Sequence, residues 1–203
     1  MTNNEHSKIP PIPLETLPEQ LPPDFLSMEI PDYMVGFSGQ VKSYCVGLVD
    51  LVDSTKISSK LSLRESGKYY EIFLNTMARV LSRYGGMIIK NGGDSLLFYF
   101  PASSSGRRYG FMTCLEGGLA LIGAHDFVSA IAKKESLPSI NYRISCDYGQ
   151  VMIMNQTTSP GVDMIGPSLN ACSKINHVAG NNEFVIGGDL YEASKKCLIM
   201  ILP

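Results

Sequence analysis

Two aspartates occupy positions where a carboxylate is costly to bury without a partner. Asp50 lies inside the apolar run 44–52, and Asp94 directly follows the glycine pair Gly92–Gly93. A charge inside a strand-like apolar stretch needs a compensating charge. A second acid delivered by a tight glycine turn favours one or two divalent cations shared between the carboxylates. The pair therefore predicts a metal site of the kind that serves phosphate chemistry.

Each aspartate taken alone has a simpler interpretation. Asp50 can be a buried acid satisfied by backbone donors, and Asp94 can be an ordinary turn residue. When the two acids are considered together, a shared metal site is favoured over both of these simpler interpretations. Paired acids within reach of each other are typical of functional sites.

The composition indicates one domain with a substantial core and excludes several classes of partner. The chain has 203 residues, 17 basic and 19 acidic side chains, and a net charge of −2. Its basic pairs are scattered, which argues against nucleic acid and against an anionic membrane surface. We also expect no secretory signal and no membrane insertion, since no apolar run approaches ~18 residues. The five cysteines form no Cys-x-x-Cys motif and read as buried hydrophobic residues in a reducing, cytoplasmic setting.

The prolines divide the chain into two parts. Seven of the twelve lie in the first 35 residues, a density that blocks both helix and sheet. Residues 1–40 are therefore predicted to be a proline-rich N-terminal arm or linker. Residues 41–203 are predicted to form the folded domain.

The folded part alternates apolar runs and amphipathic stretches in the order β-α-β-β-α-β-β-α-β-α. Its first six elements match the split βαβ pattern, an α+β ferredoxin-like sheet with helices on one face. In that arrangement the hairpin around Gly92–Gly93 lies beside the first strand, so Asp50 and Asp94 meet at one sheet edge. We expect strands at 44–52, 87–90, 95–100, 140–147, 151–155 and 183–186, a turn at 148–149, a loop at 157–162, and helices at 54–81, 109–134, 168–178 and 189–197.

Three motifs in order resemble the catalytic domain of the class III nucleotidyl cyclases, the adenylate and guanylate cyclases. They are Val49–Thr55 around the first aspartate, Lys90–Asp94 around the second, and Asp163–Lys174. In the third, an Asn stands seven residues after the Asp and a basic residue four after that. Any one motif is weak, but three with matching internal spacing are strong. The resemblance covers about residues 41–195.

The resemblance implies a role for each motif. Asp50, Asp94 and the Leu51 carbonyl would hold two Mg²⁺ or Mn²⁺ ions per site, and the backbone amides of Val52, Asp53, Ser54 and Thr55 would receive the phosphates of the substrate. Asp53 is also expected to cap the following helix with its side chain.

The same resemblance assigns the nucleoside end of the substrate. Lys90 and Asp163 would read the purine, and a donor–acceptor pair of that kind fits adenine better than guanine. Asn170 would orient the ribose. Lys174 stands where the family carries an arginine that stabilises the transition state, and a lysine offers a point charge in place of a planar fork. Taken singly, Lys90 and Asn170 can also be solvated surface residues.

The resemblance therefore implies an adenylate cyclase that converts ATP to 3′,5′-cyclic AMP and pyrophosphate at the interface of a homodimer, in intracellular signalling. Two alternatives remain. Lys174, and a C-terminus that lacks the family's final hairpin, fit a weak or inactive nucleotide-binding or dimerisation module. Gly92–Leu96 faintly echoes the signature of diguanylate cyclases, but it lacks the second acid and the aromatic residue.

Overall fold

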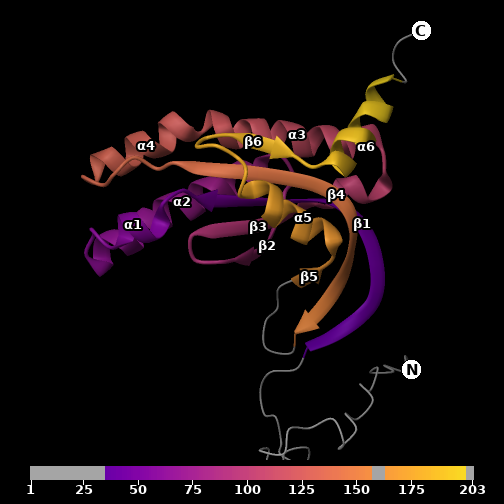
Figure 1. The fold of residues 1–203 in the computed structure, drawn as a ribbon, viewed down its shortest axis with the longest axis horizontal. Helices are drawn as coiled ribbons and strands as arrows, with labels where there is room; N and C mark the ends of the chain where they lie inside the picture. Colours follow the sequence, from indigo (N-terminus) through magenta and orange to yellow (C-terminus); the bar gives the residue numbers. More distant parts are fainter. Residues whose placement is uncertain (1–34, 157–162, 200–203) are drawn as a thin grey trace, which may run out of the picture.

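Two long antiparallel strands, β1 (Val35–Leu51) and β4 (Tyr142–Gln156), form the centre of the sheet and bend together away from the helices (Figure 1). The computed structural model describes residues 35–156 and 163–199. Most of the predicted arm and the predicted loop 157–162 lie outside that part. Strand β1 begins at Val35, six residues before the predicted start of the fold at Val41.

The strand order confirms the split βαβ prediction. The sheet runs β2-β3-β1-β4-β5, with neighbours antiparallel, and β6 pairs in parallel with β4. The hairpin of β2 and β3 therefore lies beside β1, as the topology requires. The shorter strands are β2 (Met87–Asn91), β3 (Ser95–Phe100), β5 (Asp163–Ile165) and β6 (Phe184–Ile186).

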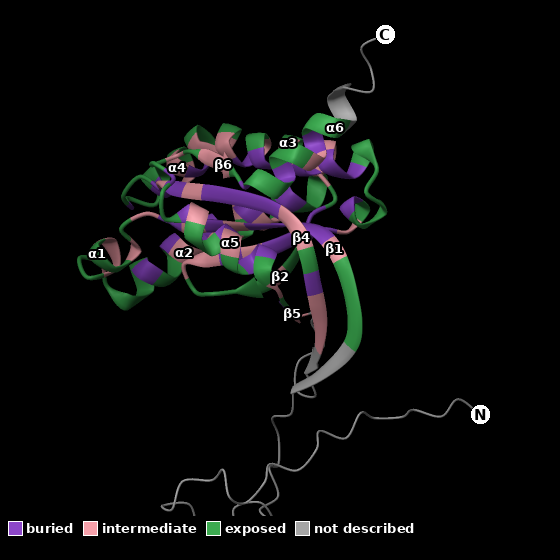
Figure 2. Cartoon of the chain, turned by 45° about the vertical axis from the view of Figure 1, so that its right-hand side comes forward, coloured by how far each residue is buried: buried purple, intermediate pink, exposed green. Residues whose placement is uncertain are grey.

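Side chains alternate between the two faces of β1, and each face has its own core. Cys45 and Val49 belong to the larger core, which includes side chains of the helices α2, α3 and α4. Tyr44 and Val46 belong to a smaller core with Leu169 of α5. Figure 2 shows the central strands buried where the helices cover them and more exposed beyond the bend. The expectation of helices on one face holds for the split βαβ unit and fails for α5, which covers the opposite face. The helices are α1 (Ser54–Ser58), α2 (Leu63–Arg83), α3 (Arg108–Gly123), α4 (His125–Lys134), α5 (Pro167–Asn176) and α6 (Gly188–Ile199).

The helix predicted over 54–81 is two helices. Helix α1 ends at Ser58, and α2 begins after Ser62 with a capping box. The Ser62 hydroxyl accepts the Glu65 N–H at 3.3 Å, while the Glu65 carboxylate accepts the Ser62 N–H at 2.8 Å. The Ser-x-x-Glu spacing is a helix-start signal that competes with the apolar periodicity running through it. The second predicted helix, 109–134, is likewise divided at Ala124.

The turn predicted at Tyr148–Gly149 is wrong, because β4 passes through both residues as one strand. Tyr148 pairs with Cys45 and Gly149 with Tyr44 in unbroken register. A side chain at Gly149 would come within 3.1 Å of the Ser168 Cβ on α5. The glycine therefore permits close approach of a helix to a strand, a use distinct from turn formation.

The stretch Arg108–Lys134 is long and apolar enough to cross a membrane by length and composition, which the sequence analysis did not anticipate. Phe111, Cys114 and Leu121 of this stretch are buried in the larger core. A helix that packs in a core passes the same test, so the prediction of no membrane insertion stays a prediction.

Four of the five cysteines, Cys45, Cys114, Cys146 and Cys172, are free and buried, as predicted for small core residues, whereas the side chain of Cys197 lies outside the described part. Burial raises the pKa of the Cys146 and Cys172 thiols. The cores of both sheet faces therefore contain thiols held in the neutral form.

We predict that Ser62→Ala lowers the free energy of unfolding by about 1 kcal/mol, because the N-terminus of α2 loses its capping oxygen. Urea denaturation followed by circular dichroism measures the change. Ser62→Asn, which keeps a capping oxygen, should unfold close to the wild type. Equal urea midpoints for Ser62→Ala and wild type would show that the box does not hold this helix start.

Candidate active site

Asp50 and Asp94 lie side by side at one end of the central strands. Asp50 is the penultimate residue of β1 and faces Ser95 of β3 in the strand register. The Leu51 N–H donates to the Asp94 carbonyl oxygen at 3.1 Å, which ties the hairpin tip to the end of β1. Gly93 makes this approach possible through a φ of +93°, a backbone conformation that favours glycine. The structure therefore brings the two predicted acids together.

Both aspartates line one open cavity of about 350 Å³ at this end of the sheet. The floor comes from the end of β1, and one wall is the turn that leads into α1. Arg143, from the neighbouring β4, stands opposite Asp50. The complete lining is Asp50, Leu51, Asp53, Ser54, Thr55, Lys56, Asp94 and Arg143.

Asp50 is the acid whose charged form this arrangement disfavours. Burial raises the pKa of Asp50, the nearby Asp94 charge raises it further, and Arg143 opposes both effects. The Ser54 hydroxyl donates to Asp94 Oδ2 at 2.6 Å and satisfies part of that acid. Two hard anionic oxygens under mutual repulsion are the environment that a divalent cation relieves.

The donor set fits Mg²⁺ or Mn²⁺ bound together with a substrate. Among the described residues, no group of three or more His, Cys, Asp or Glu side chains is placed to hold a metal. Magnesium typically binds through one or two carboxylates and completes its shell with water and substrate phosphates. Asp50, Asp94 and the Leu51 carbonyl offer such a partial shell, so a bound phosphate would have to complete it.

The turn between β1 and α1 has the shape of an anion-binding nest. Asp53 adopts a left-handed conformation, with φ 56° and ψ 27°, immediately before the right-handed α1. Successive amides in such a turn converge on one concave point. Helix α1 has only five residues, so the turn geometry contributes more here than a helix dipole does.

Two expectations about this turn need correction. The Val52 N–H donates to the Asn141 carbonyl oxygen at 2.9 Å, so this amide is not available to a phosphate, and Asp53, Ser54 and Thr55 remain. Asp53 occupies the N-cap position of α1 but makes no side-chain capping hydrogen bond. Asp53 is instead one of the residues that line the cavity.

Arg143 is a site residue that the sequence analysis missed. Its Nε and Nη2 both donate to Asp50 Oδ2, each at 3.4 Å, and its side chain is 23% exposed. An arginine between the buried Tyr142 and Ile144 was a visible signal, since charged residues inside strands need a partner. Arg143 therefore offsets part of the charge of Asp50, although the pKa of that acid stays raised.

Lys90 and Asp163 also meet, although their strands lie at opposite edges of the β2-β3-β1-β4-β5 order. Lys90 Nζ lies 3.9 Å from Asp163 Oδ2. The bend of β1 and β4 carries β5 back towards β2 (Figure 1). The lysine side chain is 64% exposed and the aspartate 14%. Because the lysine end of this ion pair is exposed, the pair itself contributes little stability.

Asn170 and Lys174 lie one helical turn apart on the exposed side of α5. Neither lines the cavity that contains Asp50 and Asp94. Within one chain the predicted site residues therefore form separate groups. The acids and the phosphate turn make one, the Lys90–Asp163 pair makes a second, and the exposed residues of α5 make a third.

The comparisons with known proteins agree with the resemblance stated from the motifs. No family model matches the chain. A protein of Streptomyces coelicolor named adenylate cyclase is 28% identical over 141 residues, which cover 70% of this chain and 31% of that protein. The chain thus spans about a third of the length of that curated relative.

Solved cyclase structures share the fold. The guanylyl cyclase Cya2 aligns with a TM-score of 0.71 at 22% identity, covering 77% of this chain and 80% of that one. The adenylyl cyclase CyaB from P. aeruginosa aligns with a TM-score of 0.69 at 20% identity, covering 77% and 82%. The guanylyl cyclase domain of RhoGC from Blastocladiella emersonii gives 0.65 at 18%, covering 82% and 90%. The chain therefore has the fold of the cyclase catalytic domain. Adenylyl and guanylyl cyclases both appear among these structures, so the shared fold does not distinguish an adenine nucleotide from a guanine nucleotide as the substrate.

We predict that Mn²⁺ raises the melting temperature of the wild-type chain by about 2–4 °C, because the ion binds only the folded arrangement of carboxylates. Asp50→Asn and Asp94→Asn should each remove this increase. Differential scanning calorimetry with and without metal measures it. An unchanged Mn²⁺ effect in both variants would place the ion elsewhere.

The metal effect should weaken in acid at a higher pH than for an ordinary aspartate pair. The pKa of Asp50 is raised, so protons compete with the metal sooner as the pH falls. Without metal, the stability of the chain depends on pH in the opposite direction. A raised carboxylate pKa contributes stability that is present at low pH and lost as the pH rises through the folded-state pKa.

Proposed function

We propose that this chain is a class III nucleotidyl cyclase catalytic domain that converts ATP to 3′,5′-cyclic AMP and pyrophosphate, acting in intracellular signalling in the cytoplasm. The observation that carries the proposal is the convergence of Asp50 and Asp94, with a phosphate-sized nest and Arg143, in one cavity. The shared fold and the Streptomyces relative support the same reaction class.

The reaction is an in-line displacement at phosphorus. The ribose 3′-oxygen bonds to the α-phosphorus, the bond from that phosphorus to the bridging oxygen breaks, and pyrophosphate leaves as the hydroxyl loses its proton. Two Mg²⁺ or Mn²⁺ ions held by Asp50, Asp94 and the Leu51 carbonyl would lower the pKa of the hydroxyl and neutralise the triphosphate. The protein's own contribution is to position the phosphates and supply positive charge.

Several groups of this chain would bind the triphosphate. The amides of Asp53, Ser54 and Thr55 line the concave side of the turn. Arg143 would move from Asp50 to a phosphoryl oxygen, since a guanidinium prefers a doubly charged oxygen cluster when the acid has a metal partner. Ser54 holds the Asp94 carboxylate in orientation through its hydroxyl.

Adenine is the base that the Lys90–Asp163 pair favours. The N1 acceptor of adenine suits the lysine ammonium, and its N6 amine suits the aspartate carboxylate. Guanine presents the opposite pattern and would leave each polar group mispaired at a cost of roughly 1–3 kcal/mol. The 3.9 Å separation of Lys90 and Asp163 supports their action as one reading pair.

A homodimer would complete the site. In one chain the acids lie in one cavity while Asn170 and Lys174 lie on the exposed side of α5 outside it. A two-fold partner could present its own α5 and purine pair to the acids of the first chain, giving two composite sites.

Lys174 favours a second candidate, a nucleotide-binding or dimerisation module that turns over slowly or not at all. Its side chain is exposed at the position where the resemblance expects an arginine. A lysine supplies charge without the bidentate geometry that fixes a phosphoryl group.

We predict that the chain forms cyclic AMP from ATP with Mn²⁺, and forms less cyclic GMP from GTP. Mass spectrometry of the products measures both. Asp50→Ala and Asp94→Ala should each lower the rate by at least about 10²–10³-fold, since each removes charge from the reacting centre. A folded dimer that yields no cyclic nucleotide with Mn²⁺ or with Mg²⁺ would reject the cyclase proposal in favour of the binding module.

Lys174→Arg should raise kcat by at least about tenfold with little change in KM, because a forked donor adds transition-state contacts. Residue 174 is exposed, so the fold should tolerate the change. Lys134→Arg, the same exchange at another exposed position, is the matched control and should leave kcat unchanged. A Lys174→Arg rate equal to wild type would show that position 174 does not contact the reacting phosphate.

A further inference from the structure

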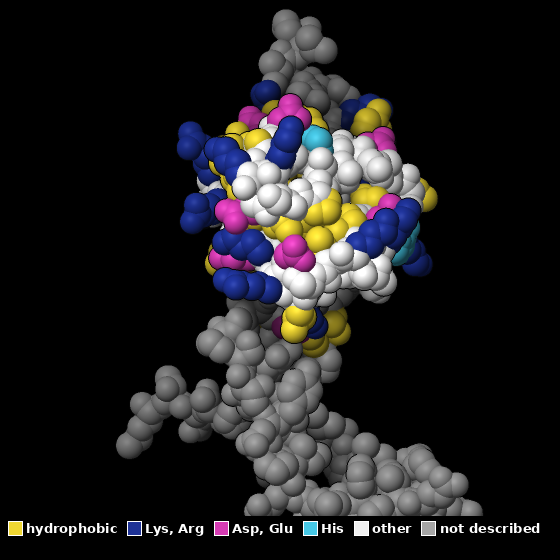
Figure 3. All heavy atoms as spheres, turned by 90° about the vertical axis from the view of Figure 1, so that its left-hand side faces the viewer, with side chains coloured by type: hydrophobic (Ala, Val, Ile, Leu, Met, Phe, Trp, Pro, Cys, Tyr) yellow, Lys and Arg dark blue, Asp and Glu magenta, His cyan; other side chains and the backbone are white. Residues whose placement is uncertain are grey.

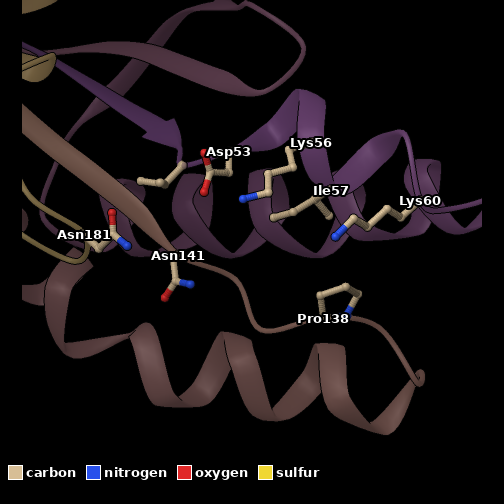
Figure 4. A pocket seen from close by; sticks show the side chains of 8 residues that line it. Asp53, Lys56, Ile57, Lys60, Pro138, Asn141 and Asn181 are labelled. Carbon is tan, nitrogen blue, oxygen red and sulfur yellow. The ribbon is translucent and has the colours of Figure 1, made fainter.

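A second cavity adjoins the candidate active site on the far side of the β1–α1 turn. It has a volume of about 260 Å³ and lies between α1 and the segments that precede β4 and β6 (Figure 4). We call it the lysine cavity, because Lys56 and Lys60 both line it. Its complete lining is Val52, Asp53, Lys56, Ile57, Lys60, Pro138, Asn141 and Asn181.

The two cavities share Asp53 and Lys56. The β1–α1 turn, which would receive the phosphates, therefore lies between the two cavities as a partition. Asp53 and Lys56 line both of them. A phosphate chain bound along the amides of Ser54 and Thr55 would run towards this partition, and the lysine cavity continues beyond it. Contiguity with a phosphate site makes an extended phosphate ligand the natural occupant.

The lysine cavity carries net positive charge. Among the described residues, no ion pair joins Lys56 or Lys60 to an acid, and Asp53 is the cavity's one acidic side chain. Lys56 lies on α1 and Lys60 in the turn after it, and two like charges that line one cavity repel each other. An anion between them removes that repulsion and gains from both charges.

The other walls strengthen this attraction and supply hydrogen bonds. Val52, Ile57 and Pro138 provide apolar surface, and the side-chain amides of Asn141 and Asn181 provide donors. The end of the molecule shown in Figure 3 has hydrophobic side chains near its centre, with lysine and arginine side chains interspersed with acidic ones around them. Charges beside apolar walls interact more strongly than charges surrounded by water.

We infer that the lysine cavity is a subsite for the end of the triphosphate chain and for the pyrophosphate that leaves it. The inference rests on the proposed function for the identity of the ligand, and on the two lysines for the site itself. Lys56 would contact the terminal phosphate before the reaction. Lys60 would bind pyrophosphate as it moves away from the metal-binding acids, which would delay the reverse reaction and order the release of products.

Asp53 sets the strength of the site. Asp53 lines both cavities, and its negative charge would repel a phosphate bound in the lysine cavity. Its left-handed backbone suits asparagine as well as aspartate. Asp53→Asn therefore removes the charge while the turn keeps its shape, and the affinity for pyrophosphate should rise about fivefold.

The test is a calorimetric titration of inorganic pyrophosphate into the full chain, in low-salt buffer freed of metals over a chelating resin. The absence of metal leaves the protein's own cations to hold the ligand. Lys60→Gln should weaken the dissociation constant about fivefold, the loss expected for one partly exposed charge pair. The matched control is Lys68→Gln on α2, where the lysine pairs with Glu71 in solvent, and its affinity should equal the wild type.

The outcomes separate this inference from the proposed function. Cyclic nucleotide formation with equal pyrophosphate affinity in Lys60→Gln and wild type overturns the subsite and leaves the cyclase intact. Weakened binding in Lys60→Gln, in a chain that makes no cyclic nucleotide, keeps the anion site and rejects the cyclase. Absence of pyrophosphate binding by the wild type overturns the subsite directly.

Discussion

The repulsion between two carboxylates held at the ends of neighbouring strands is the constraint on which this end of the molecule depends. The backbone hydrogen bond from Leu51 to Asp94 fixes the acids in place, so they cannot relax by moving apart. Arg143 and the Ser54 hydroxyl reduce the cost without removing it, and the pKa of Asp50 stays raised. An unfavourable pair of this kind in an open cavity supports the proposal that a cation binds between the two acids.

The bend of the central ribbon determines how the remaining groups are distributed. Because β1 and β4 curve together, β5 returns towards β2, and Lys90 comes close to Asp163 from the other edge of the sheet. Helix α5 then covers the face opposite the larger core and presents Asn170 and Lys174 outwards. A single chain thus holds the groups proposed to bind phosphate apart from Asn170 and Lys174 of α5. That separation is the physical basis for proposing that two copies cooperate.

Local signals predicted most of the sheet, and long-range pairing accounts for what they missed. The glycine pair before Asp94 predicted the hairpin, and the hairpin predicted the meeting of the acids. The Val52 amide was misassigned because its acceptor, Asn141, lies in a distant segment that the sequence does not place. Gly149 was predicted to form a turn, but in the structure it allows α5 to pack closely against β4. The position of Arg143 inside an apolar strand indicated that it needs a partner, and the register between β4 and β1 identifies that partner as Asp50.

The four buried cysteines allow the opening of the native core to be measured through the reactivity of their thiols. They come from β1, α3, β4 and α5, which together span both cores. Alkylating reagents attack the thiolate, and burial keeps the Cys146 and Cys172 thiols neutral. Modification of these sulfurs therefore requires the strands and helices around them to separate. The rate at which an alkylating reagent consumes them would record how often the native core opens, with no label or probe introduced.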